Sequence, residues 1–324
     1  MATSLIEQGN SRLLVTGATG FVGRAVCAAL TQRHNSVRGV VRNLPRPSSE
    51  PCELIKLNDI GLTTQWSDAL DGMNTVIHLA ARTQVTHDSA ADPLAALCAV
   101  NVAGTLNLAR QADAAGVKRF VFISSAKVNG ECTQAGQAFT EADQPKPQDA
   151  YAQSKHEAEL GLREIAAASG MEVVIIRAPL VYGPGVKGNF AALMRAVRRG
   201  WPLPLGGVQN QRSLVALDNL VDFIVTCAAH PQAANQTFLV SDGHDLSTPE
   251  LLRGLARAAG VPARLLPVPV WALQAGAALL GKSDAVQRLC GNLQVDISKA
   301  RSLLSWVPPL SVDEGFDRLL GGDD

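Results

Sequence analysis

The chain has 324 residues, of which 47% are hydrophobic and 18% charged, and its formal net charge is zero. This composition is typical of a globular protein and excludes a largely disordered one. No overall charge draws the chain to nucleic acid or to an anionic membrane, so an anionic ligand needs a local site. The length predicts one large domain or a domain with an appendage.

Strand and helix signals alternate along the first half of the chain. Short apolar runs predict strands over residues 12–16, 36–42, 75–80, 119–124 and 172–177. Helical patterns between them predict helices over residues 21–32, 94–115 and 151–168. Nearly continuous apolar strands that alternate with helices indicate a parallel sheet covered on both faces. We therefore predict a doubly wound α/β fold.

The composition of the sequence changes after Pro179. Proline and glycine become frequent as far as Gly207, and short helical and strand-like pieces alternate beyond it. Ser247-Thr-Pro-Glu250 predicts a capped helix start. We predict a first domain over residues 1–178 and a smaller mixed region over residues 179–324, with some of its segments returning to the sheet.

The cysteines, the termini and the longest apolar run indicate the compartment. None of the six cysteines has metal-ligand spacing, nor do the histidines, so no metal site is predicted. Residues 1–11 lack an apolar signal core, and Trp271–Leu280 is too short to span a bilayer. We expect a cytoplasmic protein without membrane insertion, in which Trp271–Leu280 forms a buried or groove-lining helix.

A glycine-rich loop follows the first predicted strand and opens the first predicted helix. Its G-x-x-G-x-x-G spacing lets the backbone turn tightly and approach a pyrophosphate, which the helix N-terminus can bind. A tight turn without a ligand is the weaker alternative. The motif predicts a Rossmann-type dinucleotide-binding domain followed by a mainly substrate-binding region. The loop residues expected to contact the dinucleotide are Gly17, Thr19, Gly20, Phe21, Val22 and Gly23.

The end of the second predicted strand bears on the choice of cofactor. It reads Val40-Val41-Arg42-Asn43, without the carboxylate that commonly holds the ribose hydroxyls of NAD. Arg42 can instead clamp a 2′-phosphate, which favours NADP(H). An arginine can also stack on adenine or remain solvated, and NAD(H) is then possible.

A tyrosine and a lysine are predicted to lie one helical turn apart, in Tyr151-Ala-Gln-Ser-Lys155. An adjacent ammonium stabilises phenolate and is expected to lower the pKa of the tyrosine from its usual value of about 10. Tyr151 could then exchange a proton with an alcohol or a carbonyl oxygen. Ser125, at the end of a predicted strand, could hydrogen-bond that oxygen, or it could be a strand-end cap.

Several segments together resemble the extended short-chain dehydrogenases/reductases, over almost the whole chain to about Pro308. Within that family the chain looks most like bacterial nucleotide-sugar epimerases and reductases. The narrowest likeness is to the UDP-4-keto-6-deoxy-N-acetylglucosamine 4-reductases, through residues 124–131, 180–187 and 210–215. The segments that carry the family resemblance are the glycine loop, residues 78–81, Asn101, Ser124-Ser125, Tyr151 with Lys155, and residues 177–183.

The resemblance implies roles for the matching positions. Tyr151 would be the general acid–base, with Lys155 on the nicotinamide ribose and Ser125 on the sugar C4 oxygen. Further cofactor contacts would come from Asp59, Ile60, Leu79, Ala80, Ala81 and Pro179. A UDP-sugar would be bound by Ser125, Lys127, Asn189 and Arg212, the last on the diphosphate. Members of the family often form homodimers.

Two departures from the family pattern bear on the reaction. Dehydratases carry an Asp-Glu pair where this chain has Ala126 and Lys127, which argues against removal of water. UDP-galactose-type epimerases usually keep an acidic residue where Arg42 stands, so an exchangeable NADPH fits better. We predict reduction of the 4-keto group of a UDP-linked 6-deoxyhexosamine. The alternative is a UDP-hexose or UDP-N-acetylhexosamine 4-epimerase with tightly bound NAD.

Two other functions are less favoured. A dehydrogenase of sterol-like or flavonoid-like alcohols shares the loop and the Tyr/Lys pair, but Arg212 and Asn189 suit a diphosphate better. A dinucleotide-sensing protein without catalysis would often lose the Tyr151 and Lys155 pair, which this chain retains.

Overall fold

A seven-stranded parallel sheet forms the centre of the computed structural model, which describes residues 11–44, 52–83, 92–279, 281 and 283–320. Residues 1–10, on which the expectation of no signal segment mainly rests, lie outside this range. The strand order is β3-β2-β1-β4-β5-β6-β9. The strands are β1 Arg12–Thr16, β2 Ser36–Val41, β3 Glu53–Lys56, β4 Thr75–His78, β5 Arg119–Ser125, β6 Glu172–Ala178 and β9 Thr237–Leu239.

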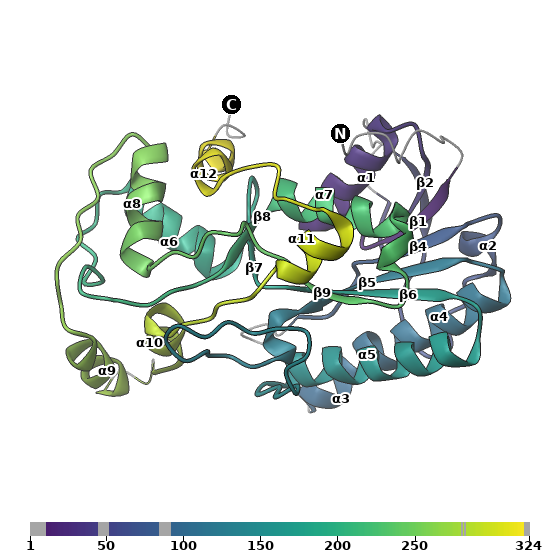
Figure 1. The fold of residues 1–324 in the computed structure, drawn as a ribbon, viewed down its shortest axis with the longest axis horizontal. Helices are drawn as coiled ribbons and strands as arrows, with labels where there is room; N and C mark the ends of the chain where they lie inside the picture. Colours follow the sequence, from purple (N-terminus) through teal and green to yellow (C-terminus); the bar gives the residue numbers. More distant parts are fainter. Residues whose placement is uncertain (1–10, 45–51, 84–91, 280, 282, 321–324) are drawn as a thin grey trace.

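Helices cover both faces of this sheet (Figure 1). One face carries α1 Phe21–Gln32, α7 Leu217–Ala229 and α11 Ser298–Leu304. The other face carries α2 Ser67–Leu70, α3 Pro93–Cys98, α4 Thr105–Ala114 and α5 Ala150–Ala168. Each side has its own buried apolar cluster, because the central strands present apolar residues to both faces. The predicted doubly wound α/β fold is confirmed.

The helix predicted over residues 94–115 is interrupted by a wider turn. Between α3 and α4 lies η1 Ala99–Gly104, a π-helical segment. The buried Asn101 of η1 donates to the Arg82 carbonyl and to Ser154 Oγ, and accepts from the Arg82 amide. Its amide therefore joins the loop after β4 to α5.

The later part of the chain builds a second, smaller body beside the sheet. Its elements are β7 Leu180–Tyr182, β8 Leu214–Ala216, α6 Gly188–Arg198, α8 Thr248–Ala258, α9 Val270–Leu279, α10 Ser283–Cys290 and α12 Val312–Leu320. A third apolar cluster fills it, with Tyr182 between Phe190 and Phe316. The start of α8 has the predicted cap, since Ser247 and Glu250 form a capping box. The elements α7, β9 and α11 belong to the sheet layer. The domain boundary at residue 178 stays a prediction.

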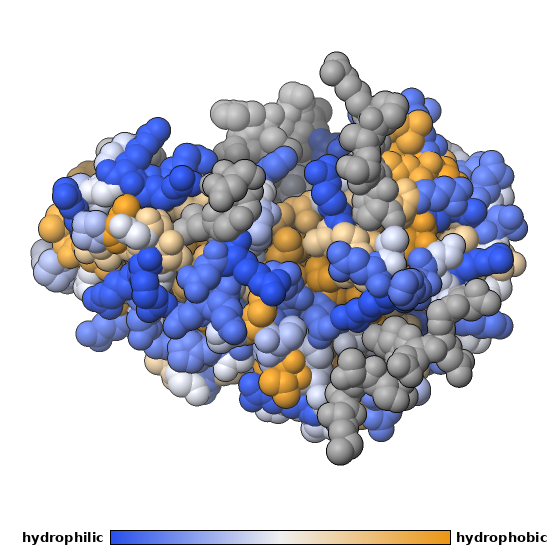
Figure 2. Space-filling model, turned by 90° about the horizontal axis from the view of Figure 1, so that it is seen from above, coloured by the Kyte–Doolittle hydropathy of each residue, from blue (hydrophilic) through white to orange (hydrophobic). Residues whose placement is uncertain are grey.

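The helix α9 departs from the expectation of burial. Trp271 is 72% and Leu279 is 89% exposed, so the prediction of a buried helix is wrong. Val270 and Gln274 do line a groove of about 300 Å³ against α10, as the alternative expected. Hydrophilic residues cover most of the face shown in Figure 2, with apolar residues between them. No helix among the described residues combines the length and the hydropathy that crossing a membrane requires.

Candidate active site

The glycine loop between β1 and α1 leaves no room for side chains. Gly17 has φ +69°, and a Cβ there would lie 3.0 Å from the backbone nitrogen of Ala80, in the loop after β4. A Cβ on Gly23 would lie 2.0 Å from the Gly17 carbonyl oxygen. The N-cap of α1 is Gly20, which has no side chain to occupy the amides of the first turn. The loop therefore forms a bare backbone cradle at a helix N-terminus, which fits a pyrophosphate.

We expect Gly23→Ala to lower both stability and dinucleotide binding, because the added methyl overlaps the Gly17 carbonyl and the loop must move. Overpacking of this kind costs about 1–3 kcal/mol. Urea unfolding and the amount of dinucleotide bound per chain measure the two effects. Gly276→Ala in α9 is the matched control, since a Cβ there meets nothing within 4 Å. Unchanged dinucleotide binding in Gly23→Ala would contradict the assignment of the loop.

His78 joins the ends of β1 and β4 and is unsuited to act as a base. Its Nδ1 is 2.7 Å from Thr16 Oγ1 and its Nε2 is 2.9 Å from Thr105 Oγ1. Burial, with a smaller contribution from Lys155, lowers the pKa of His78 to about 3. Thr16 Oγ1 also accepts from the Leu79 and Ala80 amides. These contacts fix the backbone of residues 79–81 beside the glycine loop.

The other predicted cofactor residues follow the carboxyl ends of neighbouring strands, where ligands of such sheets bind. Arg42 comes directly after β2 and is exposed. Asp59, after β3, is exposed and accepts from the Ile60 amide at 2.7 Å. Ile60 is half-buried against Gly104 of η1. Pro179 directly follows β6 and is half-buried. The topology thus brings these residues to the edge of the sheet that carries the glycine loop.

The pair Tyr151 and Lys155 lies near the start of α5, beside the end of β5. Lys155 Nζ donates to the Ile123 carbonyl at 2.7 Å and lies 4.5 Å from the Phe122 ring centre. Its distance to the centre of the Tyr151 ring is 5.9 Å. Burial lowers the pKa of Lys155 to about 7, although Glu159 acts in the opposite direction. The ammonium is thus oriented by β5 and adjoins the phenol.

The expected lowering of the Tyr151 pKa is wrong for this arrangement. Burial, and then the negative charge of Asp149, raise the pKa of Tyr151 to about 12. Lys155, 5.9 Å from the ring and with its own pKa lowered to about 7, loses its charge before the phenol titrates and does not offset the loss of hydration. Phenolate formation at neutral pH therefore requires more positive charge near the ring than these side chains supply.

Ser125 ends β5 and takes one of its two predicted roles, that of a cap, while its substrate contact stays a prediction. Its Oγ accepts from the Lys127 amide at 3.2 Å and so caps the short helix η2 Ala126–Val128. A serine hydroxyl that accepts one bond still has a proton to donate, so the cap leaves Ser125 able to bind a substrate oxygen.

Lys127, predicted to contact substrate, is held by carboxylates. Its Nζ donates to Asp149 Oδ2 at 2.6 Å and to Glu131 Oε1 at 3.0 Å. Asp149 is in turn the N-cap of α5 and accepts from the Ala152 amide at 2.7 Å. Lys127 therefore ties the segment after β5 to the helix that carries Tyr151.

A buried ion pair lies one turn beyond Lys155 on the same helix. Glu159 is fully buried and accepts from Arg177 Nε at 3.0 Å and from its Nη2 at 2.6 Å. Ser124 Oγ donates to the same carboxylate at 2.5 Å. Arg177 Nη1 also donates to Asn129 Oδ1. Sequence reasoning missed the pair, because Glu159 lies in α5 and Arg177 in β6 and no local spacing joins them.

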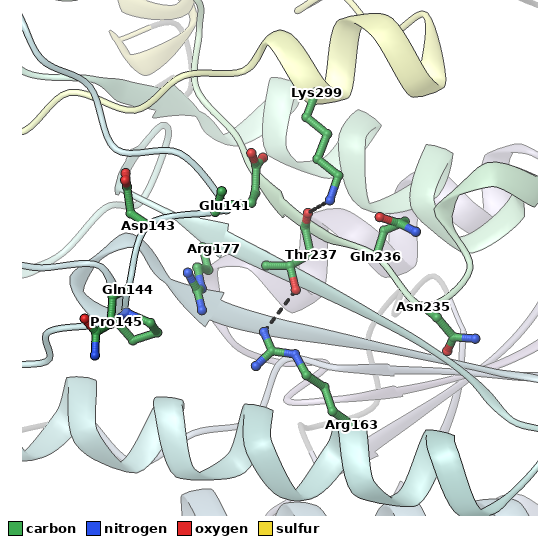
Figure 3. A pocket seen from close by; sticks show the side chains of 11 residues that line it. Glu141, Asp143, Gln144, Pro145, Arg163, Arg177, Asn235, Gln236, Thr237 and Lys299 are labelled. Carbon is green, nitrogen blue, oxygen red and sulfur yellow. Dashed lines mark hydrogen bonds between the residues drawn. The ribbon is translucent and has the colours of Figure 1, made fainter.

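Arg177 of this ion pair also lines a pocket of about 420 Å³ (Figure 3). Arg163 reaches across it, donating to Glu159 and to Thr237 Oγ1, and Lys299 donates to the Thr237 carbonyl. None of Ser125, Tyr151 and Lys155 lines the pocket. It is therefore separate from the candidate active site.

The two remaining predicted substrate residues lie on the smaller body. Asn189 is exposed in the first turn of α6. Arg212 is half-buried, and its Nη1 donates to the Gly291 carbonyl at 3.0 Å. Burial lowers the pKa of Arg212, while the nearby Cys132 and Glu131 act in the opposite direction. Glu131 thus connects Arg212 electrostatically with Lys127.

Comparison with known proteins gives the family. The model of the NAD dependent epimerase/dehydratase family matches residues 13–241. The chain belongs to this family. The UDP-glucose 4-epimerase of Vibrio cholerae is 51% identical over 306 residues, which cover 94% of this chain and 93% of that relative. The predicted place among the extended short-chain dehydrogenases/reductases is confirmed, and the narrower likeness to the 4-reductases is not.

Solved structures of two Bacillus cereus proteins share the fold of this epimerase/dehydratase family member. UDP-N-acetylglucosamine 4-epimerase has a TM-score of 0.78 at 19% identity, over 97% of this chain and 98% of that one. UDP-glucuronic acid 4-epimerase, in complex with NAD, has a TM-score of 0.76 at 21% identity, over 96% and 98%. At these identities the comparison establishes the Rossmann-type architecture. The roles of the individual site residues stay predictions.

Proposed function

We propose that this chain inverts the configuration at C4 of a UDP-hexose, with UDP-glucose as its substrate. The observation that carries the proposal is the 51% identity to the Vibrio cholerae UDP-glucose 4-epimerase over nearly the full length of both chains. This replaces the 4-keto reductase as the leading function. Both reactions use the same Tyr/Lys/Ser arrangement, and the sequence analysis chose between them on Arg42 and on the likeness of three short segments to the 4-reductases.

We propose NAD as the resident cofactor. The bare cradle formed by Gly17, Gly20 and Gly23 fits the pyrophosphate of either cofactor, so it does not discriminate between NAD and NADP. Arg42 is exposed at the end of β2, where a guanidinium can stack on adenine as readily as it can bind phosphate. The NAD complex of the Bacillus cereus epimerase supports this choice. A homodimer and a cytoplasmic location stay predictions from the sequence.

The chain's own residues would move a proton while the nicotinamide supplies reversible hydride transfer at C4. Tyr151 takes the proton of the C4 hydroxyl as the carbonyl forms and returns it when the opposite face is reduced. Ser125 donates a hydrogen bond to the same oxygen and fixes its position. Lys155, anchored on the Ile123 carbonyl, would bind the nicotinamide ribose.

The raised pKa of Tyr151 is compatible with this role in the loaded protein. An oxidised nicotinamide ring is cationic, and it would add positive charge near a phenol that already has Lys155 at 5.9 Å. Opposite charge favours phenolate and opposes the effects of burial and Asp149. The base would then form mainly when the oxidised cofactor is bound.

The purified protein, without added nicotinamide, tests the proposal. We expect it to convert UDP-glucose into UDP-galactose, as followed by chromatography of the nucleotide sugars, and to release NAD on denaturation. A parallel assay offers NADPH with a UDP-4-keto-6-deoxyhexosamine. Steady NADPH oxidation there, with no conversion of UDP-glucose, would overturn the epimerase and restore the reductase.

A further inference from the structure

Lys127 connects the two parts of the catalytic arrangement that come from different elements. Ser125 is held by β5, whereas Tyr151 is held by the first turns of α5. The Lys127 amide donates to Ser125 Oγ at 3.2 Å, and its ammonium contacts Asp149 at 2.6 Å, two residues before Tyr151. One residue thus bonds to the catalytic hydroxyl of one element and to the N-cap of the other.

The contact between Lys127 and Asp149 is partly shielded from solvent, so it can hold the two segments in a fixed arrangement. The side chain of Lys127 is 33% exposed, that of Asp149 17% and that of Glu131 20%. An ion pair at the surface usually contributes little free energy, but partial burial and the second carboxylate strengthen this pair. Burial alone would raise the pKa of Asp149, yet the hydrogen bonds from Lys127 and from the Ala152 amide lower it on balance. Asp149 is therefore an anion at neutral pH.

We propose that Lys127 is a positioning residue, whose bridge to Asp149 sets the spacing between the Ser125 and Tyr151 hydroxyls on either side of the substrate C4 oxygen. The catalytic part of this proposal rests on the proposed function. It differs from the role expected from sequence, in which Lys127 contacts the UDP-sugar. A substrate contact would act on binding, whereas a positioning residue acts on the reacting geometry.

The bridge also controls the charge next to the phenol. Asp149 is the anion that raises the pKa of Tyr151, and Lys127 lies against that carboxylate. Lys155, 5.9 Å from the ring centre, is the cation on the same helix, and Glu131 pairs with the far side of the Lys127 ammonium. Removing the Asp149 charge should therefore lower the Tyr151 pKa.

Kinetics of Lys127→Met, Asp149→Asn and the double variant test the positioning role. Asn keeps the helix cap but loses the charge. Because a misplacement of about 1 Å can cost about 100-fold, we expect Lys127→Met to lower kcat by about 10- to 100-fold with little change in KM. The loss should be small when Asp149→Asn is already present, and Lys127→Arg should restore most of the activity. A raised KM with unchanged kcat, or effects that multiply in the double variant, would overturn the proposal.

A titration without substrate separates this inference from the proposed function. The chain has only two tyrosines, and the other, Tyr182, is buried and donates to Asp242, so its pKa is raised much further. Phenolate absorbance of the purified holoprotein should therefore report Tyr151 first. We expect a lower midpoint in Asp149→Asn, because the Asp149 carboxylate is charged throughout the range in which the phenol titrates. An unmoved midpoint in Asp149→Asn would refute the effect of this carboxylate on Tyr151 whatever reaction the enzyme catalyses.

The matched control is Arg318→Met, which removes a 3.0 Å ion pair with Asp218 at the surface of α12 and α7. Its kcat and its Tyr151 midpoint should equal those of the unmodified protein. If Lys127→Met does not fold, Asp149→Asn and Lys127→Arg still decide the titration and the coupling. A movement of the midpoint without epimerase activity would retain the bridge and reject only the proposed reaction.

Discussion

Replacing Tyr151 by phenylalanine is expected to lower kcat for C4 inversion by about 10²- to 10⁴-fold, which is the usual contribution of a positioned proton-transfer group. The variant keeps the ring against the Lys155 ammonium and loses only the hydroxyl that exchanges the C4 proton. KM for UDP-glucose should change little, because the diphosphate contacts proposed for Arg212 and Asn189 lie on other elements.

Tyr182→Phe is the matched control for this substitution. Tyr182 is buried in the third apolar cluster, and its hydroxyl donates to Asp242 at 2.8 Å. Tyr182→Phe also removes a phenol oxygen, so we expect it to lower stability without affecting proton transfer. Initial rates of UDP-galactose formation, at saturating UDP-glucose, measure both variants. A Tyr151→Phe protein within about twofold of the unmodified rate would remove Tyr151 from the mechanism.

The second large effect is expected on stability. Glu159→Gln should lower the free energy of unfolding by about 3–5 kcal/mol, the cost of breaking a buried ion pair by removing one partner. Arg177 is only 2% exposed and has two of its donors on Glu159, so its charge would remain buried without a counterion. Ser124 would also lose a charged acceptor.

Urea unfolding of Glu159→Gln measures this loss, with Asp313→Asn as the control. Asp313 pairs with Arg257 at the surface, with side-chain exposures of 70% and 62%, and such a pair contributes about 1 kcal/mol or less. The double variant with Arg177→Met should recover part of the loss, because it removes the stranded charge. Equal destabilisation by Glu159→Gln and Asp313→Asn would show that the ion pair does not stabilise the fold.

The order of the strands and helices could be predicted because each leaves a local signal. The bounds predicted for β1 and α1 agree with the structure to the residue. The short strand β3 was missed, since Glu53-Leu-Ile-Lys56 has only two apolar residues. The π-helical turn was missed as well. Its hydrogen bonds span one residue more than those of an α-helix, and the segment is only six residues long, so the apolar pattern hardly changes.

The candidate site was less predictable, because its properties arise from packing. Sequence spacing brought Tyr151 and Lys155 together but could not weigh burial against charge, so it gave the wrong direction for the Tyr151 pKa. The resemblance assigned Lys127 to substrate binding, and only the fold shows Asp149 beside it. Both the cofactor and the reaction were inferred in part from Arg42, and a single exposed side chain does not determine either.

The position of β9 has a consequence for any attempt to divide this protein. A chain cut after residue 178 would leave β6 as an open sheet edge, since β9 pairs along it. It would also strip away α7 and α11, which bury the apolar face above that edge. Such an edge recruits other chains. Residues 1–178 expressed alone are therefore expected to aggregate rather than fold.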